Sequence, residues 1–120
     1  MKSWELVANI IKEQGVEHVY GIGDTDLHWY AHQTEGLKSI NLRYEGSAPF
    51  MAMAYSRLTG NPGVCSASSG PGVANLIPGV LEAHSGCVPL LIFAPSVNQK
   101  TEGMGEFQEC NQRKMMEPIT

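Results

Sequence analysis

The chain has 120 residues, of which 42% are hydrophobic and 17% charged, values typical of a globular domain rather than a disordered segment. Its formal net charge of -4 argues against a nucleic-acid partner, because such proteins need a positive surface. No apolar run reaches the roughly 18 residues of a membrane-spanning helix, and Lys2 and Glu5 stand where a secretory signal is apolar, so we expect a cytoplasmic protein with no membrane partner.

Helical and strand-like patterns alternate along the chain. Apolar residues at helical spacing predict helices over residues 3–14, 27–34, 47–59 and 73–85. Short apolar runs between them predict strands over residues 18–22, 39–42, 64–67 and 90–94. Pro78 lies inside the last predicted helix, which indicates a kink or a late helix start.

This alternation predicts an α/β fold, in which a doubly wound, mostly parallel sheet carries helices on both faces. The run 90–94 contains no polar residue, as expected of a strand covered on both sides. Such sheets bind ligands beyond the carboxyl ends of their strands. The loops expected at that edge are 23–26, 43–47, 68–72 and 95–105.

The most distinctive of these loops lies in the stretch SSGPGVAN, residues 68–75. A plain turn needs fewer glycines. A phosphate-binding P-loop would need the pattern GxxxxGK[ST], which is absent, and Gly21-Ile22-Gly23 lacks the third glycine of a dinucleotide fingerprint. The small residues either let a strand and a helix pack closely or let a ligand approach the backbone.

Four stretches read together carry a family resemblance: YEGSAPFMAMAYSRLTG, GVCSASSGPGVANLIPGVLEA, VPLLIF and GEFQECNQ. In order and spacing they resemble the N-terminal pyrimidine-binding domain of thiamine diphosphate-dependent enzymes, in the branch of acetolactate synthase, pyruvate oxidase and the 2-oxoacid decarboxylases. The resemblance runs through nearly the whole chain. It implies a thiamine diphosphate-binding fold and a lyase or transferase that makes or breaks a carbon-carbon bond next to a carbonyl, with a 2-oxoacid or related compound as substrate.

The resemblance also implies roles for individual residues. Glu45 matches a glutamate that hydrogen-bonds a ring nitrogen of the cofactor's aminopyrimidine and so activates it, a role that suits proton transfer by a carboxyl group. Ser68, Pro71 and Asn75 match positions that line the pyrimidine, and Gln108 matches one that faces the substrate in several relatives. From the local pattern alone, the glutamate would serve the positive end of the following helix, and the glutamine would open a helix.

Enzymes of this kind hold the diphosphate and Mg²⁺ on a second domain that carries a GDG motif, and this sequence has no GDG. We therefore expect residues 1–120 to be a single pyrimidine-binding domain, incomplete at its C-terminus, that is a fragment of a longer enzyme or a small subunit working with a diphosphate-binding one. The complete enzyme is expected to be a homodimer or homotetramer. The three cysteines form no CxxC spacing, and no metal ligand is expected in this chain.

Some residues depart from the family pattern. Asp24 and Asp26 add negative charge beside the expected pocket, which disfavours a second carboxylate and indicates a substrate other than pyruvate. His28, His32 and His84 are expected to lie at the surface. Two alternatives to an enzyme remain, a non-catalytic regulatory or structural subunit of the same fold and a flavodoxin-like protein that binds a nucleotide by itself.

Overall fold

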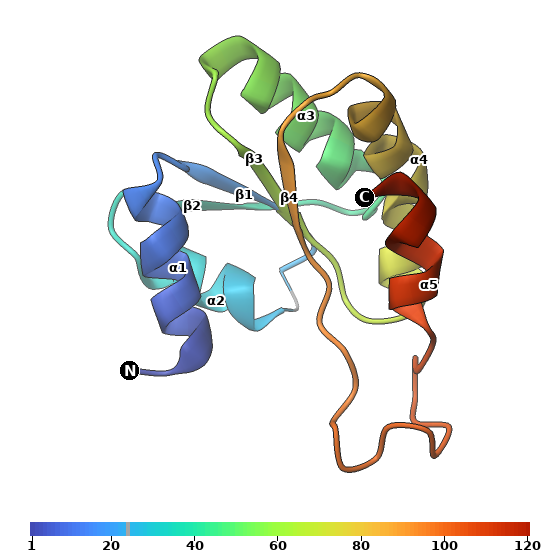
Figure 1. Ribbon diagram of the computed structural model, residues 1–120. Helices are drawn as coiled ribbons and strands as arrows, with labels where there is room; N and C mark the ends of the chain where they lie inside the picture. Colours follow the sequence, from blue (N-terminus) through green and yellow to red (C-terminus); the bar gives the residue numbers. More distant parts are fainter. Residues whose placement is uncertain (24) are drawn as a thin grey trace.

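The computed structural model describes residues 1–23 and 25–120, which form alternating helices and strands (Figure 1). In chain order the elements are α1 (Ser3–Glu13), β1 (His18–Gly21), α2 (Asp26–Gln33), β2 (Lys38–Asn41), α3 (Ser47–Thr59), β3 (Gly63–Ser66), α4 (Pro71–Ser85), β4 (Leu90–Phe93), α5 (Gln112–Met116) and the 3-10 helix η1 (Glu117–Ile119). The predicted strands are confirmed to within one residue at each end. The last two elements were not predicted.

The strands form a parallel sheet in the order β2-β1-β3-β4. Tyr20 of the central strand β1 pairs with Ile40 on one side and with Cys65 on the other. A parallel neighbour requires a crossover, which the helices between the strands provide. From β1 the chain goes first to one side of the sheet and then to the other, so the α/β doubly wound fold is confirmed and the order reverses between β1 and β3.

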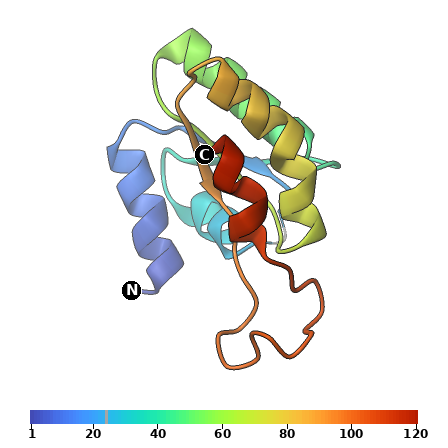
Figure 2. The same ribbon diagram turned by 45° about the vertical axis from the view of Figure 1, so that its right-hand side comes forward.

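Helices cover both faces of this sheet (Figures 1 and 2). Successive strand residues point to opposite faces, so Val19 packs among side chains of α1 and α2 whereas Tyr20 packs among those of α3, α4 and η1. Leu27 and Leu76 are 1% and 0% exposed, one in each layer. Burying a leucine of this kind contributes about 2 kcal/mol to stability.

Helix α4 differs from the prediction at its start. It begins at Pro71, two residues before the expected start, and continues through Pro78 to Ser85, so the expected late start is wrong. Proline suits the first turn because its fixed φ is helical and the N–H that it lacks would have no helical partner there. Pro78 is exposed, and the helix continues through it without the hydrogen bond that an N–H at this position would donate.

A long segment between β4 and α5 extends away from the sheet (Figures 1 and 2). We call residues 96–111 the arm. The short helices that follow it return to the body, where Met116 and Ile119 pack against the cluster under α4. Among the described helices, none is long and apolar enough to cross a membrane.

Candidate functional site

The candidate site lies at the edge of the sheet where the strands end. Because all strand pairs are parallel, the loops that leave β1, β2 and β3 emerge at this same edge, as predicted. Glu45 lies between β2 and α3, and Ser68 lies between β3 and α4. Two segments that are distant in sequence thus contribute to one place.

Glu45 and Asn75 are in direct contact. The Asn75 Nδ2 donates a hydrogen bond of 3.1 Å to the Glu45 Oε2, and both residues are half-buried. The backbone carbonyl of Glu45 also accepts from the Ala48 N–H at 2.9 Å, at the start of α3. The glutamate therefore sits at the helix terminus, as the local pattern indicated, while its side chain is held by a residue of α4.

Gly72 lets helix α4 lie close to this pair. A Cβ at this position would lie 2.8 Å from the Ser68 Oγ and 3.6 Å from the Glu45 Oε1. A glycine inside a helix costs about 1 kcal/mol relative to alanine, and here it permits the close approach of α4 to the serine hydroxyl. The Oε1 of Glu45 thus faces this glycine, while the asparagine bonds the other carboxylate oxygen.

The other predicted residues border the same loop. Pro71 is exposed at the first position of α4, and Ser68 is half-buried. Gln108 comes from the arm with a positive φ of 63°, and its backbone lies against Gly70: a Cβ on the glycine would meet the Gln108 carbonyl oxygen at 2.3 Å. Gln108 does not open a helix, because α5 begins four residues later. The structure thus places all five predicted residues near the N-terminal end of α4.

The prediction for the histidines is partly wrong. His32 and His84 are exposed, as expected, but His28 is 2% exposed. Its Nδ1 lies 2.6 Å from the Ser39 Oγ of β2, and the ring fits because Gly21 has no side chain: a Cβ there would lie 2.5 Å from the His28 Nε2. The half-buried Ser39 of β2 and a glycine of the neighbouring strand β1 make this place suitable for a polar ring.

The predicted charge beside the site is described only in part. Asp26 is exposed in the first turn of α2. Asp24, the other acid of that prediction, lies outside the described residues.

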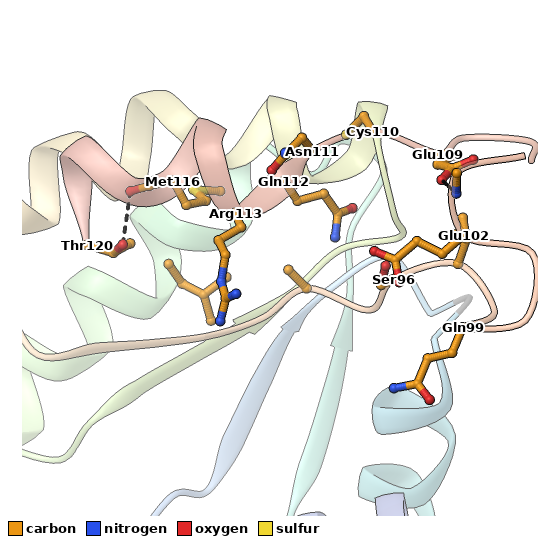
Figure 3. Close-up of a pocket in the computed structure, with 14 residues that line it drawn as sticks. Ser96, Gln99, Glu102, Glu109, Cys110, Asn111, Gln112, Arg113, Met116 and Thr120 are labelled. Carbon is orange, nitrogen blue, oxygen red and sulfur yellow. Dashed lines mark hydrogen bonds between the residues drawn. The ribbon is translucent and has the colours of Figure 1, made fainter. Parts of the chain in front are cut away.

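Two cavities border this region. One of about 250 Å³ is lined by Thr25, Ser66, Ser68 and neighbouring residues, next to the loop after β3. A wider one of about 990 Å³ lies under the arm, between β4 and α5 (Figure 3). Glu45 and Asn75 line neither of these two cavities, so the candidate site is defined by their contact at the edge of the sheet. In the described part of the chain, no group of three or more His, Cys, Asp or Glu side chains could hold a metal ion.

Sequence reasoning missed Gln112. Its side chain accepts a hydrogen bond from the Gly70 N–H at 2.6 Å and donates one to the Pro95 carbonyl at 3.0 Å. Gln112 is the last letter of the stretch GEFQECNQ, but a polar residue after a glycine-rich loop carries no local signal for a contact 42 residues away.

Comparison with known proteins gives a family. The family model described as "Thiamine pyrophosphate enzyme, N-terminal TPP binding domain" matches residues 1–115. Acetolactate synthase of Bacillus subtilis is 39% identical over 118 residues, which cover 97% of this chain and 21% of that protein. The 2-hydroxyacyl-CoA lyase 1 of Dictyostelium discoideum is 37% identical over 114 residues, which cover 93% of this chain and 20% of the lyase.

The acetolactate synthase large subunit of Haemophilus influenzae is 34% identical over 118 residues, covering 96% of this chain and 21% of that subunit. The chain thus spans about a fifth of the length of the relatives that it matches. The match to the family model extends over nearly all of the 120 residues, and the parallel sheet agrees with it. This chain therefore belongs to the N-terminal TPP-binding domains of thiamine pyrophosphate enzymes, the family that its sequence resembles.

Proposed function

We propose that this chain is the pyrimidine-binding portion of a thiamine diphosphate-dependent enzyme that makes or breaks a carbon-carbon bond next to a carbonyl. One relative is named a synthase and another a lyase, names that denote making and breaking a bond. We infer a 2-oxoacid or related carbonyl compound as the substrate. The observation that supports this best is the Glu45 carboxylate, oriented by Asn75 with its Oε1 facing Gly72.

The residues around Glu45 suit a flat aromatic ring. Asn75 donates to the Oε2 of Glu45, so the carboxyl group is held in one orientation and its Oε1 faces Gly72. Ser68 and Pro71 are small enough to border a ring at close range. Thiamine diphosphate, when bound, supplies the carbanion chemistry, and the protein supplies binding and orientation.

Glu45 would act by holding a proton. In our proposal its Oε1 shares a proton with a ring nitrogen of the aminopyrimidine and so controls the basicity of that ring. Asn75 keeps the carboxyl group in position for this contact, and Gln108, at the arm beside Gly70, is assigned to the substrate side. A carboxyl group is suited to this role because it can both donate and accept a proton at one oxygen.

The diphosphate needs a second binding unit. A diphosphate carries several negative charges and is held by cations and amide donors, whereas this chain has a net charge of -4 and no GDG motif. We propose that residues 1–120 form one domain and that another domain or subunit holds the diphosphate and Mg²⁺. The complete enzyme would be a homodimer or homotetramer with the cofactor between domains.

The test is Glu45→Gln in the complete protein. Glutamine still accepts the hydrogen bond from Asn75 but cannot hold the carboxyl proton, so turnover should fall by about a hundredfold or more while the melting temperature stays the same. Glu13→Gln is a matched control, because Glu13 is exposed at the end of α1. Full turnover in the Glu45 variant would refute the catalytic role and favour a regulatory or structural subunit.

A further inference from the structure

The Gln112 side chain connects two segments that border the candidate site. It projects from the first position of α5 (Figure 3). Its Oε1 accepts from the Gly70 N–H at 2.6 Å, and its Nε2 donates to the Pro95 carbonyl at 3.0 Å. Both polar atoms of this amide are therefore used, one on the loop after β3 and one at the exit of β4.

Gly70 has little freedom to move. It is buried, and its φ of 68° is one that residues with a side chain rarely adopt. Its carbonyl accepts the first helical bond of α4 from the Ala74 N–H at 3.0 Å, and the Gln108 backbone packs against its Cα, where a Cβ would lie 2.3 Å from the Gln108 oxygen. Because a buried N–H needs a partner, the glutamine side chain determines where this peptide group lies.

Gln112 is itself held from both sides. Asn111, the residue before it, caps α5 by accepting from the Lys114 N–H at 3.0 Å. After α5 the chain is anchored by Met116 and the buried Ile119, which pack against the cluster under α4. The glutamine is thus fixed to the body of the domain rather than to the projecting part of the arm.

We propose that Gln112 is a positioning residue, which fixes the 68–72 loop against the exit of β4 and the start of α5 and thereby sets the places of Ser68 and Pro71. Ser68 and Pro71 lie on either side of Gly70, and Gly72, in the first turn of α4, borders Glu45. The amide thus orients this segment, which forms the wall beside Glu45. That this wall contacts a pyrimidine rests on the proposed function, whereas the hydrogen bonds of Gln112 do not.

The experiment compares three variants of the complete protein. Gln112→Ala removes both hydrogen bonds, and Gln112→Glu keeps an acceptor for the Gly70 N–H but loses the donor to Pro95. Gln33→Ala is the matched control, because Gln33 is exposed and bonds only weakly, at 3.4 Å, to a carbonyl of its own helix. Two quantities are measured well below the melting temperature: the dissociation constant of thiamine diphosphate with Mg²⁺, and amide hydrogen exchange over residues 66–75.

Gln112→Ala should weaken cofactor binding about tenfold or more and speed exchange over residues 66–75, because a misplaced wall loses contacts with the ring. Gln112→Glu should fall between this variant and the native protein, and the control should match the native protein. A merely structural glutamine would lower the melting temperature and leave the dissociation constant of the folded protein unchanged. That result, or unchanged exchange, would overturn the proposal.

The two proposals fail in different ways. If the native complete protein binds no thiamine diphosphate at millimolar concentration, the proposed function is wrong, and hydrogen exchange alone then decides the role of Gln112. Faster exchange in the Gln112→Ala variant would support the role of Gln112 in fixing the loop. Unchanged exchange would refute that role too.

Discussion

The 68–72 loop, whose last two residues begin α4, and the arm both contain glycine at positive φ, yet they are held in different ways. Gly70 is buried between the Gln112 amide and the Gln108 backbone, so residues distant in sequence fix its place. The arm is exposed, with Met104 and Phe107 at 77% and 85%, and its turn is organised by its own Glu109. Neighbouring structure imposes the first conformation, and local hydrogen bonds impose the second.

The largest effect should come from adding one methyl group to each region. Gly70→Ala should lower the free energy of unfolding by about 4 kcal/mol, because the new Cβ would both meet the Gln108 carbonyl and strain a left-handed φ. Gly103→Ala on the arm also strains a positive φ, of 85°, but a Cβ there would have nothing within 4 Å, so it should cost only about 1 kcal/mol.

Urea unfolding of the two variants measures this difference. Both glycines have positive φ, so the difference between the variants reports the close approach of Gln108 to the loop together with the ψ of -112° at Gly70. Equal losses of stability would mean that the arm does not press on the loop, and the comparison between the two regions would collapse.

The second test removes the hydrogen bonds within the arm. The Glu109 carboxylate accepts from the backbone N–H groups of Gly103, Gly105 and Glu106, the last two at 2.8 and 3.0 Å. Glu109→Gln puts an NH₂ group against one or more of these donors, so trypsin should cleave after the exposed Lys100 about fivefold faster. Glu102→Gln, an exposed carboxylate of the same arm, should leave the rate unchanged.

The same contact has a pH dependence of known sign. Hydrogen bonds from Gly103 and Glu106 lower the pKa of Glu109 below its ordinary value of 4.5. A lowered folded-state pKa means that the stabilising bonds are present above pH 4.5 and are lost as the pH falls through the lower value. NMR titration of the Gly103 and Gly105 amides should follow that lower pKa, and a midpoint at or above 4.5 would show that the carboxylate does not organise the turn.

The regular elements were predictable because their signals are local. A helix or strand shows its period within a few residues, so the alternation of elements and the parallel sheet followed from the sequence. The start of α4 was misplaced because Pro71 was treated as part of a loop, although proline is favoured in the first turn of a helix. The last residues of the sequence show no clear hydrophobic periodicity, so α5 and η1 were not predicted.

The site was predictable only where a family resemblance supplied distant partners. Glu45 and Asn75 are 30 residues apart, and no periodicity connects them, yet the resemblance assigned both to one pocket and the structure places them in contact. His28 and Gln112 were missed because their environments come from other elements: Ser39 and Gly21 for the histidine, Gly70 and Pro95 for the glutamine. The catalytic and binding roles themselves stay predictions.

The smallest expected effect on the fold comes from a difference in thiol reactivity between the two regions. Cys65 of β3 is buried just before the 68–72 loop, and burial raises its pKa to about 12, whereas Cys110 at the end of the arm and Cys87 are exposed. At pH 8 we expect a thiol reagent to modify the two exposed cysteines rapidly and Cys65 only after unfolding, because the reactive thiolate is absent from the core.

Since the folded-state pKa of Cys65 lies above its ordinary value of 9.0, the stability that its neutral thiol contributes is fully present below pH 9.0 and is lost as the pH rises toward about 12. Cys65→Ser should therefore flatten the fall in stability over that range, because serine does not ionise there. Rapid modification of Cys65 in the folded protein would show that the strand beneath the loop opens readily, and the loop would then be no better fixed than the arm.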